Sequence, residues 1–195
     1  MYIYKKTKDF VHIKNFLNKS EIDFYLNKSK KYFEHQSKVG TSVRFKNKIR
    51  KDIFFNKNDC TVLDRIIFTN NKKFLFDHFG YDIRYREDYK MGTYYGDKKG
   101  HYIPHTDNQG GMNHRKVSCV ICLSKKEDYE GGIFHFVDLK KTFKFDKGDA
   151  ILFRSHLLHG VQPVESGIRK VIISFLWDND GFEQKNIPIS NNRSQ

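Results

Sequence analysis

The sequence predicts an α+β protein in which N-terminal helices pack on one sheet of an all-β core, a double-stranded β-helix or jelly roll. Helical spacing of apolar residues is confined to the first 80 positions, and short aromatic segments separated by glycine-containing turns follow them. Aromatic residues make up 15% of the chain, with 18 Phe and 11 Tyr, and such side chains favour sheets. The 195 residues suffice for one domain with a hydrophobic core.

Residues 1–80 are expected to form the helical support of this core. Alternation of apolar and polar side chains predicts a short strand over residues 11–17. Residues 20–23 (Ser-Glu-Ile-Asp) have the spacing of a helix N-cap with an acidic residue at N3, and apolar residues at helical spacing follow. A second helix is predicted over residues 61–76, where the apolar side chains share one face.

The jelly-roll core is predicted over residues 81–182, which completes a single domain spanning residues 1–182. Glycine pairs and Lys-Gly-Asp or Ser-Gly turns separate about eight strands, the number expected for two packed sheets. The segments with strand character are 83–89, 93–95, 102–105, 117–123, 133–137, 142–145, 150–153, 160–164 and 170–177. The polar residues 183–195 predict a flexible tail.

The charge is strongly positive, with a formal net value of +13, and basic residues concentrate between Lys28 and Lys57. A basic patch of this kind could attract nucleic acid or an acidic protein. A solvated protein surface also explains the excess of basic residues, and we prefer that interpretation. Nucleic acid therefore stays a partner that the sequence allows but does not favour.

Membrane and secretory features are missing from the sequence. The first residues lack the apolar core of a secretory signal, and no run of 18 apolar residues occurs, so no membrane partner is expected. The three cysteines, Cys60, Cys119 and Cys122, are an odd number without a second pair. We expect reduced thiols in a cytoplasmic protein.

The most specific feature is the motif His105-Thr106-Asp107, with His159 following 54 positions after the first histidine. Residues i and i+2 of a strand project from the same face, so His105 and Asp107 can hold one ion together. His159 from a distant strand would complete two imidazoles and one carboxylate, with open coordination positions. That ligand set is typical of non-haem Fe(II) sites that react with O2.

Other metal ligands are less well supported. His101 and His105 have the i,i+4 spacing of a helical zinc site, but Gly100 and Pro104 make a helix there improbable. The Cys-x-x-C motif formed by Cys119 and Cys122 lies in a predicted strand, where the two side chains point to opposite faces. Core packing is therefore the better explanation for the two thiols.

The segment from Tyr95 through His105 and Asp107 to His159 and Arg169 resembles the 2-oxoglutarate- and Fe(II)-dependent dioxygenases, in particular their prolyl 4-hydroxylase, oxygen-sensing-type branch. The resemblance implies that His105, Asp107 and His159 bind iron. It implies that Arg169 binds the distal carboxylate of 2-oxoglutarate and that Tyr95 donates a second hydrogen bond to it. The implied co-substrates are 2-oxoglutarate and O2, and ascorbate is the implied reductant.

Strand geometry also favours Arg169 as the carboxylate anchor. A guanidinium binds a carboxylate through two parallel hydrogen bonds and stays charged where water is scarce. Lys170 is adjacent, but alternation along the strand places it on the opposite face. Cys122 departs from the family, whose members carry at this position a tyrosine that helps to hold 2-oxoglutarate.

Five residues are predicted to contact substrate. Arg50 and Asp52 resemble an Arg-x-Asp segment that the oxygen-sensing-type enzymes place beside their peptide, and Arg115 matches a basic residue nearby. We add Tyr102 next to the metal ligands and Trp177 at the end of the last strand. A surface ion-pair group is the alternative for Arg50, Asp52 and Arg115.

The function that this resemblance implies is hydroxylation of a prolyl residue in a protein or peptide, with succinate and CO2 as co-products. Three alternatives remain. The same chemistry could act on a free amino acid or on nucleic acid, although demethylases of nucleic acid carry two arginines where this chain has Glu165 and Val171. A cupin-like binding module without catalysis would show a broken ligand set.

Overall fold

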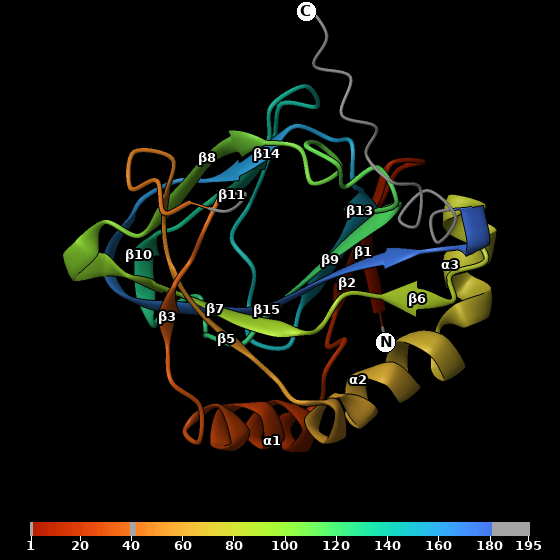
Figure 1. The fold of residues 1–195 in the computed structure, drawn as a ribbon, viewed down its shortest axis with the longest axis horizontal. Helices are drawn as coiled ribbons and strands as arrows, with labels where there is room; N and C mark the ends of the chain where they lie inside the picture. The colour runs from red at the N-terminus through yellow and green to blue at the C-terminus, as the bar shows by residue number, and fades with distance from the viewer. Residues whose placement is uncertain (1, 40–41, 181–195) are drawn as a thin grey trace, which may run out of the picture.

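Two antiparallel sheets form the core of the computed structural model, which describes residues 2–39 and 42–180, and helices cover the outer face of the larger sheet (Figure 1). The large sheet has the order β1-β2-β13-β9-β15-β7-β5-β3, with β6 and β10 paired to β15. The small sheet has the order β12-β11-β14-β8-β4. The strands of the large sheet are β1 (Tyr2–Lys6), β2 (Phe10–Lys14), β3 (His35–Gln36), β5 (Lys51–Phe54), β6 (Tyr85–Arg86), β7 (Lys90–Tyr95), β9 (Val117–Cys122), β10 (Tyr129–Gly131), β13 (Ala150–Arg154) and β15 (Val164–Trp177). Those of the small sheet are β4 (Lys48–Ile49), β8 (His101–His105), β11 (Phe134–Phe136), β12 (Lys141–Phe143) and β14 (His159–Val161). The predicted jelly roll with helices on one sheet is confirmed.

The helices follow one another from the lower edge of the view in Figure 1, where α1 lies, to its right side, where α3 lies. They are α1 (Lys19–Ser29), α2 (Thr61–Asp64) and α3 (Lys72–Phe79), with a π-helical segment, Arg65–Asn70, between the last two and short 3-10 turns at Lys57–Cys60 and Gly96–Lys98. Within residues 2–39 and 42–180, no helix is long and apolar enough to cross a membrane.

The N-cap of helix α1 is Asn18, two residues before the predicted N-cap Ser20. The Asn18 side chain accepts a hydrogen bond from the Glu21 backbone, and the Glu21 carboxylate accepts one from the Asn18 backbone. These reciprocal bonds form a capping box, which satisfies two backbone donors at once. The prediction of Ser20 as N-cap was wrong because Asn18 competes for the same role and has an acid at the required spacing.

The second predicted helix is interrupted. Residues 61–76 belong to α2, the π-helical segment and α3, and the break lies at Asn71, whose side chain donates to the Ile66 carbonyl at 2.7 Å. The helix then continues to Phe79 and ends at Gly80, which has a φ of 77° that favours glycine. The spacing of apolar residues could not predict this break, because it arises from an asparagine side chain that hydrogen-bonds to a backbone carbonyl of the helix.

Alternation along the strands divides the apolar residues into two layers. On β9, Cys119 and Ile121 face the helices, while Val120 and Cys122 face the small sheet. The layer under the helices is mostly aliphatic, and phenylalanine is the commonest residue in the layer between the sheets. All three cysteines are free and buried. Opposite faces for Cys119 and Cys122 agree with the prediction from strand parity.

Residues 1–80 contribute more than helices. Strands β1 and β2 extend the large sheet beyond β13, and β5 and β3 extend it beyond β7. Strand β4 joins the small sheet through β8. The segment 48–54 was missed as strand because its charged residues obscure the alternation. This addition matters for the site, since β4 and β5 bring basic side chains to the interior.

Candidate active site

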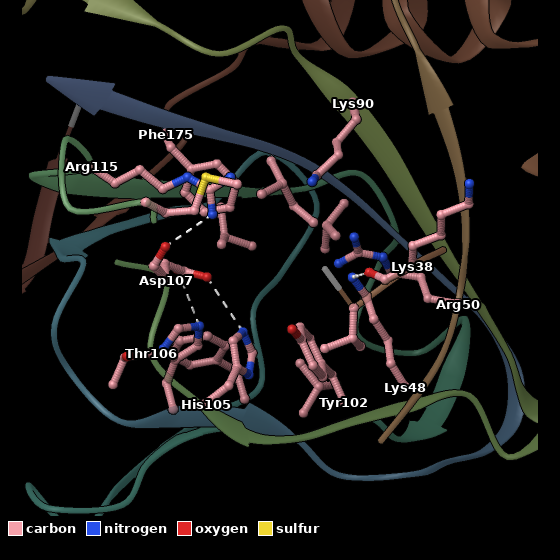
Figure 2. Close-up of a pocket in the computed structure, with 18 of the residues that line it drawn as sticks. Lys38, Lys48, Arg50, Lys90, Tyr102, His105, Thr106, Asp107, Arg115 and Phe175 are labelled. Atoms are coloured by element: carbon pink, nitrogen blue, oxygen red, sulfur yellow. Dashed lines mark hydrogen bonds and ion pairs between the residues drawn. The ribbon is translucent and has the colours of Figure 1, made fainter. Parts of the chain in front are cut away.

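The predicted metal ligands meet where the two sheets face each other. His105 ends β8, Asp107 follows it, and His159 begins β14 directly opposite His105 in the antiparallel register. The Asp107 carboxylate lies 3.4 Å from Nε2 of His105 and 3.4 Å from Nε2 of His159, and the ligand atoms of all three lie within 4.8 Å of one another. Figure 2 shows His105 below Asp107, with dashed lines joining the carboxylate to imidazole nitrogens.

Backbone carbonyls fix the orientation of both imidazoles. Nδ1 of His105 lies 2.9 Å from the Ile103 carbonyl, and Nδ1 of His159 lies 2.8 Å from the Leu157 carbonyl. A carbonyl only accepts, so each Nδ1 carries the proton and each Nε2 presents its lone pair toward Asp107. Burial lowers the pKa of His159 to about 4, which keeps this imidazole neutral, the form that binds metals.

The third ligand is held as a carboxylate. Burial opposes ionisation of Asp107, but the neighbouring His159, His105 and Ser118 outweigh it and hold the pKa of this carboxyl well below its usual range. The Ser118 hydroxyl donates to Oδ2 of Asp107 at 2.6 Å. Arg115 donates to the Asp107 backbone carbonyl at 2.9 Å. The carboxylate is therefore ionised and fixed in position.

A cavity of about 440 Å³ opens from this cluster into the space between the sheets. Pocket-facing positions of β15 alternate with core positions, so Val171, Ile173 and Phe175 line the cavity while Ile172 and Leu176 pack under the helices. The remaining apolar lining comes from Val39, Met112, Val120, Phe134 and Val161. A largely apolar wall with a few charged groups is typical of small-molecule sites.

Arg169 also lines this cavity, and no carboxylate in residues 2–39 and 42–180 forms an ion pair with it. It is only 1% exposed, and none of its three guanidinium nitrogens has a hydrogen-bond partner within the described residues. Its guanidinium carbon lies 5.2 Å from the centre of the Tyr94 ring. Burial raises the pKa of Tyr129 to about 12, and the nearby charge of Arg169 opposes this rise. The Tyr129 hydroxyl itself donates to the Phe145 carbonyl at 3.4 Å. A buried cation with unused donors requires an anionic ligand.

Lys170 takes no part in the cavity. It follows Arg169 on β15 and pairs with Thr93, whereas Arg169 pairs with Tyr94. Strand alternation therefore places Lys170 on the other face. This agrees with the cavity wall, which includes Arg169 but not Lys170.

Tyr95, expected to bind 2-oxoglutarate, lies outside the cavity wall. Its hydroxyl donates to a Glu34 carboxylate oxygen at 2.7 Å, and burial together with Glu34 raises its pKa to about 12. Tyr94, one position earlier and 2% exposed, lines the cavity instead. The difference is one residue of strand parity: β7 pairs with β15 so that Tyr94, and not Tyr95, shares a face with Arg169.

Arg50 and Asp52 form a buried ion pair and not a surface group. Nε of Arg50 lies 2.6 Å from Oδ1 of Asp52, and Nη2 lies 2.9 Å from Oδ2, while Nη1 donates to the Tyr94 hydroxyl at 3.2 Å. Arg50 lines the cavity and Asp52 stands behind it. This position lets Arg50 contact a bound molecule but removes Asp52 from direct contact.

The other three predicted substrate residues separate into two groups. Arg115 lines the cavity, and a bidentate pair with Glu87 at 2.6 and 2.8 Å holds it there. Tyr102 lines it too, with its ring stacked on that of His105 at 3.5 Å between centres. Trp177 does not reach the cavity: it is 3% exposed and packs its ring edge against His114. Its parity matches that of Phe175, but β15 has passed the cavity by this point and pairs with β6.

Two lysines of the cavity wall were not anticipated. Lys48 comes from β4, and Lys90 comes from β7. The signal that could have identified Lys90 is its spacing from Gly92 and Tyr94, because residues i, i+2 and i+4 of a strand share a face. Nothing in the local sequence distinguished Lys48 from the many other lysines nearby.

Cys122 is the residue expected to depart from the tyrosine of the resembled family. Its thiol is buried and donates to the Ser124 carbonyl at 3.2 Å, and burial raises its pKa. It therefore presents no hydroxyl toward the cavity, and the tyrosines near Arg169 are Tyr94 and Tyr129.

Comparison with known proteins supports this site. Residues 90–177 match the model of the 2OG-Fe(II) oxygenase superfamily. A PKHD-type hydroxylase from Sphingopyxis alaskensis is 42% identical over 93 residues, covering 45% of this chain and 40% of the relative. A second, from Colwellia psychrerythraea, is 36% identical over 83 residues, covering 40% of this chain and 37% of the relative. The chain thus spans about two fifths of the length of these curated relatives.

Solved structures share the fold over most of both chains. A prolyl hydroxylase from Trichoplax adhaerens, in complex with a peptide fragment of the hypoxia inducible factor oxygen degradation domain, superposes with a TM-score of 0.71 at 21% identity, covering 90% of this chain and 86% of that one. The viral collagen prolyl hydroxylase of Paramecium Bursaria Chlorella virus-1 gives 0.65 at 22% identity, covering 87% and 96%. At these identities the similarity establishes the architecture.

The superfamily implies Fe(II) and 2-oxoglutarate as bound groups, and the cavity fits both. Two imidazole lone pairs and one carboxylate directed at a common point suit a divalent iron. The three unpaired nitrogens of Arg169 suit a carboxylate of 2-oxoglutarate. The segment that matches the 2OG-Fe(II) oxygenase superfamily, residues 90–177, carries all four of these side chains.

Proposed function

We propose that this protein is an Fe(II)- and 2-oxoglutarate-dependent dioxygenase that hydroxylates a prolyl residue in a protein or peptide and releases succinate and CO2. One observation carries the proposal. A complete set of two histidines and one carboxylate opens into the same cavity as a buried arginine whose guanidinium makes no hydrogen bond within the described part of the chain. When bound, iron and 2-oxoglutarate supply the oxidising chemistry that inserts oxygen into a C–H bond.

The residues of the chain position these groups and keep water out. His105, His159 and Asp107 would hold the metal, with their ligand atoms fixed in advance by two carbonyls and the Ser118 hydroxyl. Arg169 would hold a carboxylate at the far part of the cavity through two parallel hydrogen bonds. The apolar wall formed by β15 limits the water that can reach the reacting carbon.

The prolyl substrate is supported by similarity and by the cavity wall. The relatives are named PKHD-type hydroxylases, and neighbours in fold are prolyl hydroxylases, one of them with a peptide bound. Arg50, Arg115 and Tyr102 line the cavity beside the metal ligands and offer donors to a peptide backbone. We include ascorbate as reductant and a cytoplasmic location in the proposal.

Two alternatives concern the substrate and one concerns catalysis. A free amino acid would use the same cavity. The lysines of the cavity wall, Lys48 and Lys90, favour an acidic group on the substrate, whether it is a peptide or a free amino acid. Nucleic acid gains no support from the cavity, whose basic groups lie inside and not on an open track. A binding module without catalysis predicts an incomplete ligand set, whereas His105, Asp107 and His159 all converge.

Formation of succinate from 2-oxoglutarate tests the proposal directly. We expect Fe(II)-dependent succinate formation by the wild type, stimulated by proline-containing peptides, and its loss in His105→Ala. His101→Ala is the matched control, because His101 lies on the same strand but binds only the carbonyls of Lys99 and Lys46. Succinate formation that no peptide stimulates would retain the oxygenase and redirect the search to free amino acids or nucleic acid. A wild type without Fe(II)-dependent turnover would contradict the proposal.

A further inference from the structure

One side of the cavity carries more positive charge than the proposed reaction uses. Six cationic side chains line it, against the single carboxylate of Asp107. Figure 2 shows three of them, Lys48, Arg50 and Lys90, on the side away from His105 and Asp107. The six are Lys38, Lys48, Arg50, Lys90, Arg115 and Arg169.

The arrangement of these cations is built into the strands. Lys90 and Tyr94 face the cavity from β7, and Gly92 stands between them. A Cβ atom at Gly92 would lie 2.7 Å from Cδ of Arg50, so the Arg50 side chain crosses β7 in the space that the glycine leaves. Arg50 is thereby placed between Lys90 and Tyr94.

Two of the six cations already have carboxylate partners, and a third has an expected one. Arg50 is paired with Asp52, and Arg115 is paired with Glu87. Arg169 would be neutralised by one carboxylate of 2-oxoglutarate under the proposed function. Of the three lysines that remain, Lys38 is exposed, whereas Lys48 is buried and Lys90 is partly buried. Neither Lys48 nor Lys90 has an ion-pair partner among the described residues.

Lys48 is the more buried of the two lysines. It is 5% exposed, its ammonium group donates to the Lys38 carbonyl at 3.3 Å, and it lies 4.4 Å from the centre of the Tyr102 ring. Burial and then the charge of Arg50 lower its pKa to about 6. The Lys48 side chain thus lies on the side of the cavity away from His105 and Asp107 (Figure 2), with the Tyr102 ring, which stacks on His105, next to it.

Lys90 approaches the same space from the other sheet. Its ammonium nitrogen lies 5.2 Å from the centre of the Phe175 ring, and burial followed by the charge of Arg50 lowers its pKa. Neither Lys90 nor Lys48 makes an ion pair with any residue in the ranges 2–39 and 42–180. Burial beside an arginine disfavours the charged form of both lysines, and an anion bound to both of them would favour that form again.

We propose that Lys48 and Lys90 bind a carboxylate of the substrate, so that the substrate of this enzyme is acidic. The inference rests on the proposed function and specifies its substrate class. The carboxylate could be the main-chain carboxylate of a free amino acid or the side chain of an Asp or Glu next to the modified residue in a peptide. Both sources present the same chemistry to the two ammonium groups.

Matched acidic and neutral ligands test this assignment. The protein is loaded with Mn(II) and a non-reactive analogue of 2-oxoglutarate, and binding is measured by calorimetry. The two probe pairs are acetyl-Pro-Glu-amide against acetyl-Pro-Gln-amide, and L-proline against L-prolinamide. We expect the acidic member of at least one pair to bind about tenfold or more tightly than its neutral partner. The pair that shows the preference identifies the source of the carboxylate.

The lysine variants decide whether these side chains are responsible. Lys48→Met and Lys90→Met should each reduce the acidic preference about tenfold and leave the affinity for the 2-oxoglutarate analogue within about twofold of wild type. Lys141→Met is the matched control, because Lys141 is exposed on β12, outside the cavity, and its loss changes the net charge equally. Circular dichroism confirms that each variant is folded.

Three outcomes would overturn the inference. The first is equal affinity of the wild type for both members of both pairs. The second is an acidic preference that survives in both lysine variants. The third is that the lysine variants lose affinity for the 2-oxoglutarate analogue and not for the acidic probe. Failure of the proposed function looks different, since it would abolish Fe(II)-dependent succinate formation in the wild type. Normal succinate formation without acidic preference would refute only the substrate class.

Discussion

Replacing Arg169 with methionine should weaken 2-oxoglutarate binding and, at the same time, stabilise the protein without ligands. Its three guanidinium nitrogens are buried and unpaired within the described chain, so the ligand-free protein bears an uncompensated charge. Two charge-assisted hydrogen bonds to a carboxylate, at roughly 1.5–3 kcal/mol each, correspond to a loss of at least about 100-fold in affinity. Methionine fills similar space without charge, which should raise the free energy of unfolding by on the order of 1–4 kcal/mol.

The assay combines two measurements on Arg169→Met and a control. Calorimetry with Mn(II)-loaded protein gives the affinity for 2-oxoglutarate, and thermal unfolding of metal-free protein gives stability. For a chain of this size, each 1 kcal/mol shifts Tm by roughly 2–4 °C. Lys170→Met removes the same charge from the opposite face of β15 and should change neither quantity appreciably.

The two effects have opposite signs, and this separates a ligand anchor from a structural residue. A structural role would make Arg169→Met less stable and would weaken binding only as far as the site unfolds. Unchanged affinity in a well-folded variant would refute the reasoning altogether. An equal loss of affinity in Lys170→Met would show that overall charge, and not the buried guanidinium, is responsible.

Three further predictions follow from the same geometry. His105→Ala should lose high-affinity Mn(II) binding, whereas His101→Ala keeps it, as measured by calorimetry without 2-oxoglutarate. Lys48→Met should stabilise the metal-free protein most near pH 6 and progressively less toward pH 10. The pKa of Lys48 is about 6 in the folded protein and near 10.4 in the unfolded chain. Between these values Lys48 is protonated in the unfolded chain but not in the folded protein. The free energy of unfolding of the wild type therefore rises with pH, by up to about 1.4 kcal/mol per pH unit. Gly92→Ala should cost roughly 1–3 kcal/mol in chemical unfolding, because its Cβ would displace Arg50.

Each of these predictions has a result that contradicts it. Metal binding retained in His105→Ala would show that the ion is bound elsewhere. A stability gain in Lys48→Met that does not depend on pH would mean that Lys48 is charged in the folded protein at neutral pH. If Gly92→Ala unfolds like the wild type, Arg50 moves freely and its pair with Asp52 does not position it.

The residues with specific chemistry could be found from sequence because their spacing is local to single strands. His105 and Asp107 are two positions apart, and a strand must place them on one face. The preference for Arg169 over Lys170 followed from the same rule, and the register of β15 agrees with it. Tyr95 was expected in place of Tyr94 because parity relative to Arg169 depends on the register between β7 and β15, which no local pattern specifies.

The substrate side of the cavity shows the same limit. Arg50 and Asp52 were identified as a pair, but their burial depends on β5 joining the large sheet beyond β7. Trp177 has the parity of a cavity residue and still lies outside, because β15 extends past the cavity. Lys48 and Lys90 come from different sheets, and no sequence spacing relates them.

The sequence by itself therefore determined the jelly-roll class, the three side chains that converge at His105, Asp107 and His159, and the inward-facing basic residue Arg169. These features depend on alternation within one strand and on residue types whose chemistry is specific. The tertiary structure alone decided which tyrosine faces Arg169 and which lysines enter the cavity without an ion-pair partner among the described residues. The physical reason is that register and sheet order arise from packing between distant segments, and a shift of one residue moves a side chain from the cavity to the opposite face.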